Sequence, residues 1–175
     1  MRLDTVKTVA IVSDTHGHLN ERIAEVIQQC DIAVHAGDVG NAQVVQAMQP
    51  KLGQVYLVKG NNDVASKWPA EQKSVLAQLQ ECITLELMGG QLVVLHGHKQ
   101  NPVAARHSVL RKLFCTARLI VYGHSHRLCL DQDHAPWVVN PGAAGKARTY
   151  GGASCVVLHI SPDHWRLESI RVTDS

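Results

Sequence analysis

Five apolar segments of this sequence each end in a short loop that combines glycine with aspartate, asparagine or histidine. The segments cover residues 6–12, 32–36, 55–59, 91–95 and 119–122. The loops that follow them are Asp14-Thr15-His16-Gly17, Gly37-Asp38, Gly60-Asn61-Asn62-Asp63, His96-Gly97-His98 and Gly123-His124-Ser125-His126. Short apolar runs bounded by turn residues predict buried β-strands. Because open α/β sheets gather ligand-binding loops at the carboxyl ends of their strands, we expect the five loops to meet in space.

Three stretches carry signals for the start of a helix. Asn20 and Asn41 are each placed to cap a helix between two of the strands. Pro102, with Asn101 as the cap, predicts the first turn of a third helix that runs to about Phe114. Strands that alternate with helices predict βαβ units and a partly parallel sheet.

The second half of the chain adds further strands. Met88-Gly89-Gly90 separates the apolar runs 83–87 and 91–95 and predicts a hairpin turn. Three more strands are expected, over residues 137–139, 153–160 and about 165–172. No internal repeat or linker interrupts the pattern, so the sequence predicts one domain over residues 1–175.

The bulk composition excludes several classes of protein. Of 175 residues, 45% are hydrophobic and 18% are charged, as in ordinary globular domains, and the formal net charge is only +2. Without a run of Lys or Arg, stable nucleic-acid binding has no electrostatic support, although a nucleotide substrate stays open. No apolar run approaches the ~20 residues that cross a bilayer, and we see no signal-peptide pattern. Five widely spaced cysteines without a C-x-x-C pair are expected to be reduced, which predicts a cytoplasmic protein.

The polar residues after the strands are suited to metal ions. The chain holds 11 His against a single Phe, and histidine is the commonest side-chain metal ligand. Seven residues are candidate ligands: Asp14, His16, Asp38, Asn61, His96, His124 and His126. This set of nitrogen and oxygen donors is too large for one tetrahedral site but suits two ions that share a carboxylate. It favours Mn, Fe, Zn, Ni or Co over ions that select thiolates.

Each motif alone also has an ordinary structural explanation. A Gly-Asp pair is a common turn, an aspartate can cap a helix, and the imidazoles of His124 and His126 need not face one centre. The combination of all five motifs, each after an apolar strand, is what indicates a metal site. Clustered carboxylates and imidazoles would be costly to bury without bound metal.

These motifs resemble those of the calcineurin-like metallophosphoesterase superfamily, whose pattern is D-x-H, G-D, G-N-x-D, H-G and G-H-x-H. The match continues to Asn140-Pro141-Gly142-Ala143, which is similar to the N-P-G-S segment of small bacterial and archaeal phosphodiesterases. Ala143 replaces the usual Ser, and we interpret the segment mainly as a structural turn. The resemblance covers nearly the whole chain. It implies a four-layer α/β/β/α sandwich with two mixed sheets and a dinuclear metal site at the strand ends.

The resemblance also implies roles for the seven residues. The ligands fall into two sets with one shared residue: Asp14, His16 and His126 for the first ion, Asn61, His96 and His124 for the second, and Asp38 as the bridge. The implied activity is that of a dinuclear metal-dependent phosphodiesterase, a hydrolase in which a metal-bridging hydroxide attacks phosphorus. Its cofactors would be two divalent ions, with Mn preferred over Fe, Ni, Zn or Co. Its substrate would be a small phosphodiester or nucleotide-like molecule, with no membrane partner.

Several residues depart from the family pattern or flank it. Many relatives carry His where this chain has Asn62, and that His assists phosphate binding or protonates the leaving group. An amide is no acid at ordinary pH, so Asn62 favours the phosphodiesterase branch and leaves His98 as the candidate catalytic acid, with a supporting or surface role as the alternative. His35 is either a support of the site or a simple strand-end residue. Lys146 and Arg148 could reach a substrate phosphate, although loop cations are more often solvated.

Three alternative functions are weighed against this one. The first is a phosphomonoesterase or nucleotide phosphatase of the same fold; the purple-acid type has Tyr three positions after the Gly-Asp aspartate, where this chain has Asn41. The second is a nuclease of the larger recombination type, which would need an added DNA-binding cap or a basic surface, and neither is visible in 175 residues with a net charge of +2. The third is a non-catalytic metal-binding scaffold that binds other proteins, as in one trafficking subunit that has lost ligands. All seven ligand positions are intact here, which favours catalysis.

Overall fold

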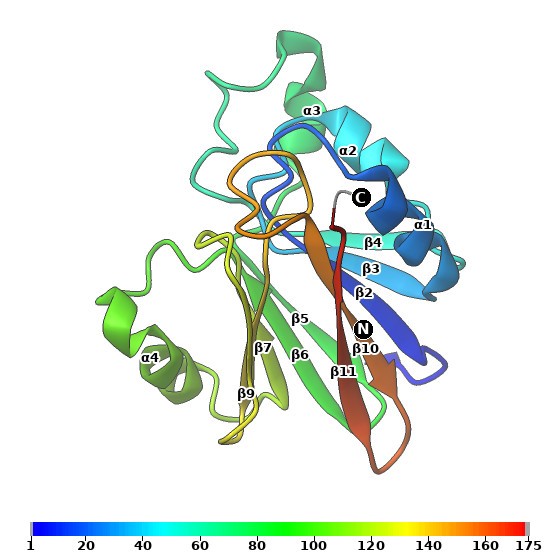
Figure 1. Cartoon of the computed structure of the whole chain (residues 1–175), viewed down its shortest axis with the longest axis vertical. Helices are drawn as coiled ribbons and strands as arrows, with labels where there is room; N and C mark the ends of the chain where they lie inside the picture. The colour runs from blue at the N-terminus through cyan, green and yellow to red at the C-terminus, as the bar shows by residue number, and fades with distance from the viewer. Residues whose placement is uncertain (1, 174–175) are drawn as a thin grey trace.

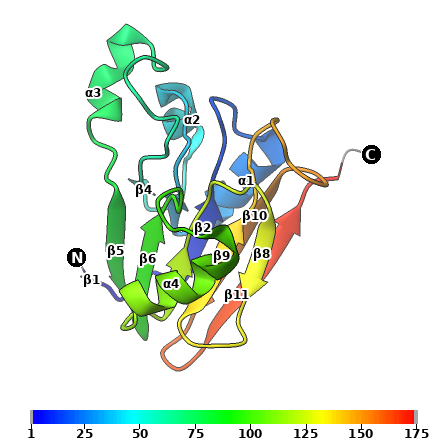
Figure 2. The same cartoon turned by 90° about the vertical axis from the view of Figure 1, so that its left-hand side faces the viewer.

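The fold consists of two β-sheets packed face to face, with helices on both outer faces (Figures 1 and 2). The computed structural model describes residues 2–173. The layers follow the order α/β/β/α, which confirms the predicted four-layer sandwich with two mixed sheets. Within the described residues, no helix is both long enough and apolar enough to cross a membrane.

The first sheet has the strand order β11-β10-β2-β3-β4. Its strands are β2 (Thr8–Val12), β3 (Ile32–His35), β4 (Gln54–Leu57), β10 (Ser154–Ile160) and β11 (Trp165–Arg171). β2, β3 and β4 are parallel to one another, whereas β10 is antiparallel to both β2 and β11. β2 and β3 are almost continuously apolar because both faces of these central strands are covered. The three parallel strands therefore end at one edge of the sheet.

Two helices cover the outer face of this sheet: α1 (Glu21–Gln29) and α2 (Ala42–Ala47). The side-chain oxygen of Asn20 accepts hydrogen bonds from the backbone N–H groups of Arg22 (3.0 Å) and Ile23 (3.4 Å). Asn41 accepts one from the N–H of Val44 (3.1 Å). These bonds satisfy donors that the first turn of a helix leaves free. Both predicted caps are confirmed.

The second sheet has the strand order β1-β5-β6-β7-β9-β8. Its strands are β1 (Arg2–Leu3), β5 (Cys82–Leu87), β6 (Gly90–Leu95), β7 (Leu119–Val121), β8 (Leu128–Asp131) and β9 (Trp137–Pro141). β5 and β6 form the predicted antiparallel hairpin. β6, β7 and β9 are parallel, so β6 and β7 also end at a common edge.

The predicted helix after residue 102 begins later than expected. A 3-10 turn, η2 (Val103–Ala105), comes first, and α4 (Arg106–Leu113) follows it on the outer face of the second sheet. The prediction of Asn101 as the cap is wrong. Pro102 has an extended backbone (φ −70°, ψ 157°) and lies at the cap position of the 3-10 turn without a side-chain bond. Two small helical elements after β4, η1 (Ala70–Gln72) and α3 (Lys73–Leu76), were not predicted, nor were β1 and β8.

The core between the sheets fixes their relative position. Ile11 and Val34 from the first sheet pack in one apolar cluster with Leu92 and Val121 from the second. Trp165 is fully buried, and its indole N–H donates to the carbonyl of Met88 (2.9 Å) in the β5–β6 turn. All five cysteines are free thiols, as predicted. The rigid pairing of the sheets aligns their strand ends along one rim of the sandwich.

Candidate metal centre

The seven predicted ligands lie at this rim, in loops that follow five strands. Asp14 and His16 follow β2, Asp38 follows β3, Asn61 follows β4, His96 follows β6, and His124 and His126 follow β7. The parallel pairing of β2, β3 and β4 places three of the loops side by side, and the pairing of β6 and β7 places the other two. Residues separated by more than a hundred positions thereby come into contact.

The backbone at five of these ligands is left-handed. The residues with positive φ are Asp14 (54°), His16 (46°), Asp38 (56°), His124 (68°) and His126 (58°). Such angles cost a non-glycine residue roughly 1–2 kcal/mol each, and they cluster at functional sites where the surroundings enforce them. Each strand end thus turns sharply and directs its side chain into a shared centre.

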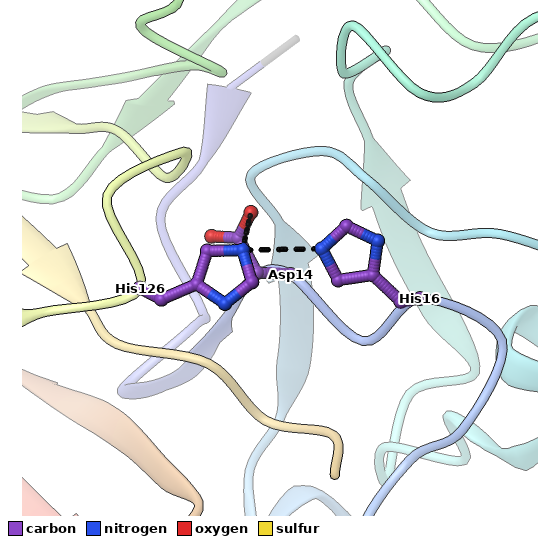
Figure 3. Close-up of side chains that lie close together, drawn as sticks. All are labelled: Asp14, His16 and His126. Carbon is purple, nitrogen blue, oxygen red and sulfur yellow. Dashed lines mark hydrogen bonds and ion pairs between the residues drawn. The ribbon is translucent and has the colours of Figure 1, made fainter. Parts of the chain in front are cut away.

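Figure 3 shows the first set of ligands, Asp14, His16 and His126. The Nε2 atoms of His16 and His126 are 3.1 Å apart, and Nε2 of His126 is 3.4 Å from Oδ1 of Asp14. One ligand atom from each of the three residues falls within 4.8 Å of the other two. This spacing allows three donors to reach a single ion.

The second set is arranged around Asn61. Its side-chain oxygen is 3.1 Å from Nε2 of His96 and 3.0 Å from Nδ1 of His124. Oδ2 of Asp38 lies between the two sets, 3.5 Å from Nε2 of His96 and 3.7 Å from Nε2 of His16. A carboxylate in that position can contact two ions at once.

Hydrogen bonds behind the ligands fix the orientation of their rings. Nδ1 of His96 donates to the carbonyl of Ala36 (2.8 Å), and Nδ1 of His126 donates to the carbonyl of Ala147 (3.1 Å). Because a carbonyl can only accept, Nδ1 holds the ring hydrogen in the neutral form of each ring, and in that form Nε2 directs its lone pair at the centre. The donor chemistry and its orientation fit two divalent ions.

Asn62 contacts the candidate bridge, Asp38, through both its backbone and its side chain. Its backbone N–H donates to Oδ1 of Asp38 (2.8 Å) and its side-chain amide donates to Oδ2 (2.7 Å). The ammonium of Lys67 in turn donates to the side-chain oxygen of Asn62. The sequence pattern marked Asn62 only as a missing acid. Lys67 lies outside every motif, so nothing in the sequence pointed to this contact.

Asp63 connects two of the ligand loops. Its carboxylate accepts hydrogen bonds from the backbone N–H groups of Val39 (3.1 Å), Gly40 (3.0 Å) and Gly60 (2.9 Å), and from the indole N–H of Trp68 (3.1 Å). Asp63 is fully buried. It therefore holds the loop after Asp38 against the residue that precedes Asn61.

The pKa values of the two buried carboxylates of the centre, Asp14 and Asp38, are shifted in opposite directions. Burial raises the pKa of Asp14 to about 7, although His96 and Ser13 oppose the rise. Burial would also raise the pKa of Asp38, but hydrogen bonds from His96 and Asn62 outweigh it and hold that pKa below its usual range. Asp38 is therefore the permanently ionised carboxylate of the pair.

The pKa values of the four candidate-ligand imidazoles are also shifted in two directions. Burial lowers the pKa of His16 and of His126, and it lowers the pKa of His124 to about 4. Burial acts in the same sense on His96, but interactions with Asp38 and Asp14 outweigh it and raise the pKa of His96. At neutral pH three of the rings are neutral and able to bind a cation, so metal binding would release protons mainly from Asp14 and His96.

His98 and His35 lie beside the ligands. The ring centroid of His98 is 5.4 Å from that of His96, and its buried Nδ1 has no hydrogen-bond partner among the described residues. His35 is fully buried; its Nδ1 accepts from the N–H of Gly37 (3.1 Å), and its Nε2 lies 2.9 Å from the hydroxyl oxygen of Thr15. Of the two interpretations of His35, the structure supports the one in which it braces two ligand loops.

The segment after β9 contributes contacts of two kinds. The amide of Asn140 donates to the carbonyl of Gly123 (2.7 Å) and accepts from the N–H of Gly142 (2.9 Å), so it holds the His124 loop. Further along, a guanidinium nitrogen of Arg148 lies 3.2 Å from Nε2 of His126. Lys146 lines a groove outside the centre, together with Asn20, Val172 and neighbouring residues.

Comparison with known proteins identifies the family and the fold. The profile of the calcineurin-like phosphoesterase superfamily domain matches residues 8–163. The chain therefore belongs to the calcineurin-like phosphoesterase superfamily, as its motifs predicted. A phosphodiesterase from Methanocaldococcus jannaschii is 27% identical over 141 residues, which cover 77% of this chain and 82% of that protein. Together these findings support a hydrolase that acts on phosphoester bonds.

Solved structures show the same fold at low sequence identity. A structure described as a novel archaeal phosphodiesterase is 21% identical, has a TM-score of 0.69, and matches over 93% of this chain and 99% of its own. Vps29 of Entamoeba histolytica, solved in complex with Zn²⁺, is 14% identical, has a TM-score of 0.68, and matches over 94% and 98%. At these identities the likeness establishes the fold alone.

Proposed function

We propose that this chain is a dinuclear metal-dependent phosphodiesterase. The observation that carries the proposal is the position of Asp38, whose Oδ2 lies between His16 of one ligand set and His96 of the other. Two donor sets that share a carboxylate suit a pair of divalent ions, and two such ions activate water and neutralise charge on phosphoryl oxygens. The seven predicted residues are the proposed ligands, in the two sets given above.

The residues around the ligands act as orienting groups in this proposal. Asn62 holds both oxygens of Asp38 through its backbone and side-chain N–H groups. Ser13 donates to Oδ2 of Asp14 (2.7 Å), which directs the other oxygen toward His126. A ligand shell that is already oriented needs little reorganisation when substrate binds, and this is where such sites gain rate.

The leaving group receives modest help in this proposal. Asn62 is bonded to Asp38 and carries no acidic proton, so His98 is the candidate acid. Burial and the neighbouring His96 lower the pKa of His98, so its ring is mostly neutral near pH 7 and protonates a departing oxygen inefficiently. The proposal therefore favours diesters, or other substrates whose leaving group departs without much protonation.

Substrate and metal follow from the same reasoning. The relative named as a phosphodiesterase supports a small phosphodiester or nucleotide-like substrate. The mixed nitrogen and oxygen donors favour Mn²⁺, with Fe, Ni, Zn or Co as alternatives. One domain and a cytoplasmic location complete the proposal.

The test is hydrolysis of bis(p-nitrophenyl) phosphate by the purified protein with added Mn²⁺. Activity should disappear after chelation and return with Mn²⁺, and Asp38→Ala should lower the rate by more than the roughly 10–100-fold typical of outer-shell substitutions. Asp133→Ala, which removes an exposed carboxylate outside the centre, should leave the rate unchanged. Hydrolysis that survives both chelation and Asp38→Ala would exclude the two-metal mechanism.

A second candidate function is that of a metal-binding scaffold for other proteins, because the chain shares its fold with Vps29. Both functions require bound metal, so only turnover separates them. A protein that binds Mn²⁺ but hydrolyses neither diesters nor monoesters would favour the scaffold. Faster hydrolysis of p-nitrophenyl phosphate than of the diester would instead favour a phosphomonoesterase.

A further inference from the structure

Arg148 contacts a metal-facing atom of the centre. One of its terminal nitrogens is 3.2 Å from Nε2 of His126. The other ring nitrogen of His126 donates to the carbonyl of Ala147, which leaves Nε2 as an acceptor. Arg148 therefore donates an N–H toward the lone pair that also faces Nε2 of His16 and that the first ion would need.

The loop that carries Arg148 is anchored on both sides. On one side, the N–H of Ala144 donates to the carbonyl of Ser13 (2.9 Å), next to the ligand Asp14. On the other side, the carbonyl of Tyr150 accepts from a guanidinium nitrogen of Arg171 (2.8 Å), and the guanidinium of Arg127 lies 4.2 Å from the centre of the Tyr150 ring. Arg148 itself has a left-handed backbone (φ 53°). These contacts fix the path of the loop, from which the exposed Arg148 side chain extends.

The charge of Arg148 is not neutralised by a carboxylate. Among the described residues, none of the ion pairs includes Arg148. A guanidinium and a divalent ion cannot share one lone pair, and two cations a few ångströms apart repel each other. An anion that lies between the guanidinium and the ion would offset this repulsion. A phosphoryl group is such an anion, and the planar fork of arginine matches its oxygens.

We propose that Arg148 alternates between two partners. In the metal-free protein it covers Nε2 of His126 and competes with the first ion. In the metal-loaded protein its guanidinium is released and binds a phosphoryl oxygen of the substrate, a second role that rests on the proposed phosphodiesterase function. Arg148 then provides the phosphate-binding cation that the neutral Asn62 does not.

The two roles predict effects of opposite sign for Arg148→Gln. Titration of the metal-free protein with Mn²⁺ in phosphate-free buffer, followed by calorimetry, should show tighter binding in the variant. The expected gain is roughly 10-fold, the lower end of what a charge-assisted hydrogen bond contributes. Titration of the Mn²⁺-loaded protein with inorganic phosphate should show binding weakened by roughly 10-fold for the same reason. In diester hydrolysis, KM should rise more than kcat falls.

Lys146→Gln is the matched control, since it removes the same charge from the same loop at a side chain that lines the outer groove. It should change neither titration. The proposal is overturned if Arg148→Gln weakens both ligands, which indicates a structural role, or changes neither, which indicates a solvated cation. It is also overturned if phosphate affinity is unchanged, or if Lys146→Gln reproduces the effects. A wild-type protein that hydrolyses no diester would refute the proposed function, while both titrations would still decide the role of Arg148.

Discussion

Asp63→Asn tests whether a buried carboxylate holds the ligand loops together. The substitution keeps the shape of the side chain but turns one acceptor oxygen into an N–H₂ group. In the wild-type protein, each carboxylate oxygen of Asp63 accepts from two donors: Oδ2 from Val39 and Gly60, and Oδ1 from Gly40 and Trp68. Whichever way the amide is oriented, two of the four donors lose their acceptor and stay buried.

The expected cost follows from those two lost bonds. A hydrogen bond to a charged group contributes about 1.5–3 kcal/mol, so the free energy of unfolding should fall by about 3–6 kcal/mol. That is a large share of the roughly 5–15 kcal/mol by which ordinary domains are stable. Urea denaturation of the metal-free protein, followed by tryptophan fluorescence, measures the difference. Asp133→Asn, at an exposed position, should change the stability by less than about 0.5 kcal/mol.

A loss below about 1 kcal/mol, with an unchanged dependence on urea, would refute this reasoning about Asp63. Trp68→Phe gives a graded second measurement because it removes a single donor and leaves the carboxylate in place. Its loss should be smaller than that of Asp63→Asn. In any Asp63 variant that folds, Mn²⁺ affinity should fall by roughly 10–100-fold, as for other residues that orient ligands, because the loops of Asp38 and Asn61 are no longer joined.

Three further predictions concern ionisable side chains in and beside the site. Asn62→His should raise the rate of hydrolysis of substrates with poor leaving groups by roughly 10²-fold or less, because a general acid helps poor leaving groups most. The rate on the p-nitrophenyl diester should change little. Equal effects on matched substrates would contradict this prediction. His98→Gln should act in the opposite direction on the same pair. Burial lowers the pKa of His35 from 6.5 to about 4, so its contribution to stability is complete above pH 6.5 and is lost as the pH falls toward 4. The difference in free energy of unfolding between wild type and His35→Gln should therefore shrink by about 3 kcal/mol between pH 6.5 and pH 4. Asp14 has the opposite pH dependence, but it is present in both proteins and cancels in this difference. A difference in urea midpoints that stays constant with pH would contradict the prediction.

The fold could be predicted largely because its central strands are buried on both faces. Runs such as Thr8–Val12 and Ile32–His35 have no other reading in a chain of this composition, and the glycine-containing loops mark their ends. The missed elements lack such signals. β8 is short, and its residues are all partly exposed without alternation, so only its pairing with β9 defines it as a strand. The start of α4 was misplaced because Pro102 fits a 3-10 turn as well as a helix.

The candidate ligands could be predicted from the sequence for a related reason. Metal-binding residue types follow five of the predicted strands, and the sheet topology brings them together. What the sequence could not reveal were partners defined by three-dimensional contact. Lys67 reaches Asn62 from outside any motif, and Arg148 reaches His126 through a loop whose path depends on Tyr150 and Arg171. Spacing along the chain carries no information about such contacts.

The left-handed ligands explain why so many residues support the centre. Five strained positions at roughly 1–2 kcal/mol each would relax if the loops were free, so the strain persists only because neighbouring bonds over-determine the backbone. Asp63, Asn140 and His35 supply those bonds from three directions, all to backbone N–H or carbonyl groups of the loops. None of the three needs a metal ion to do so. The donor set is therefore assembled before any ion arrives, and metal binding need not drive folding as it does in small zinc domains. Asp38→Ala leaves all three of these residues in place but removes the acceptor of two Asn62 hydrogen bonds. It should therefore keep the fold with a lowered free energy of unfolding, and a far-UV spectrum like that of the wild type is the condition under which that variant can test the proposed function.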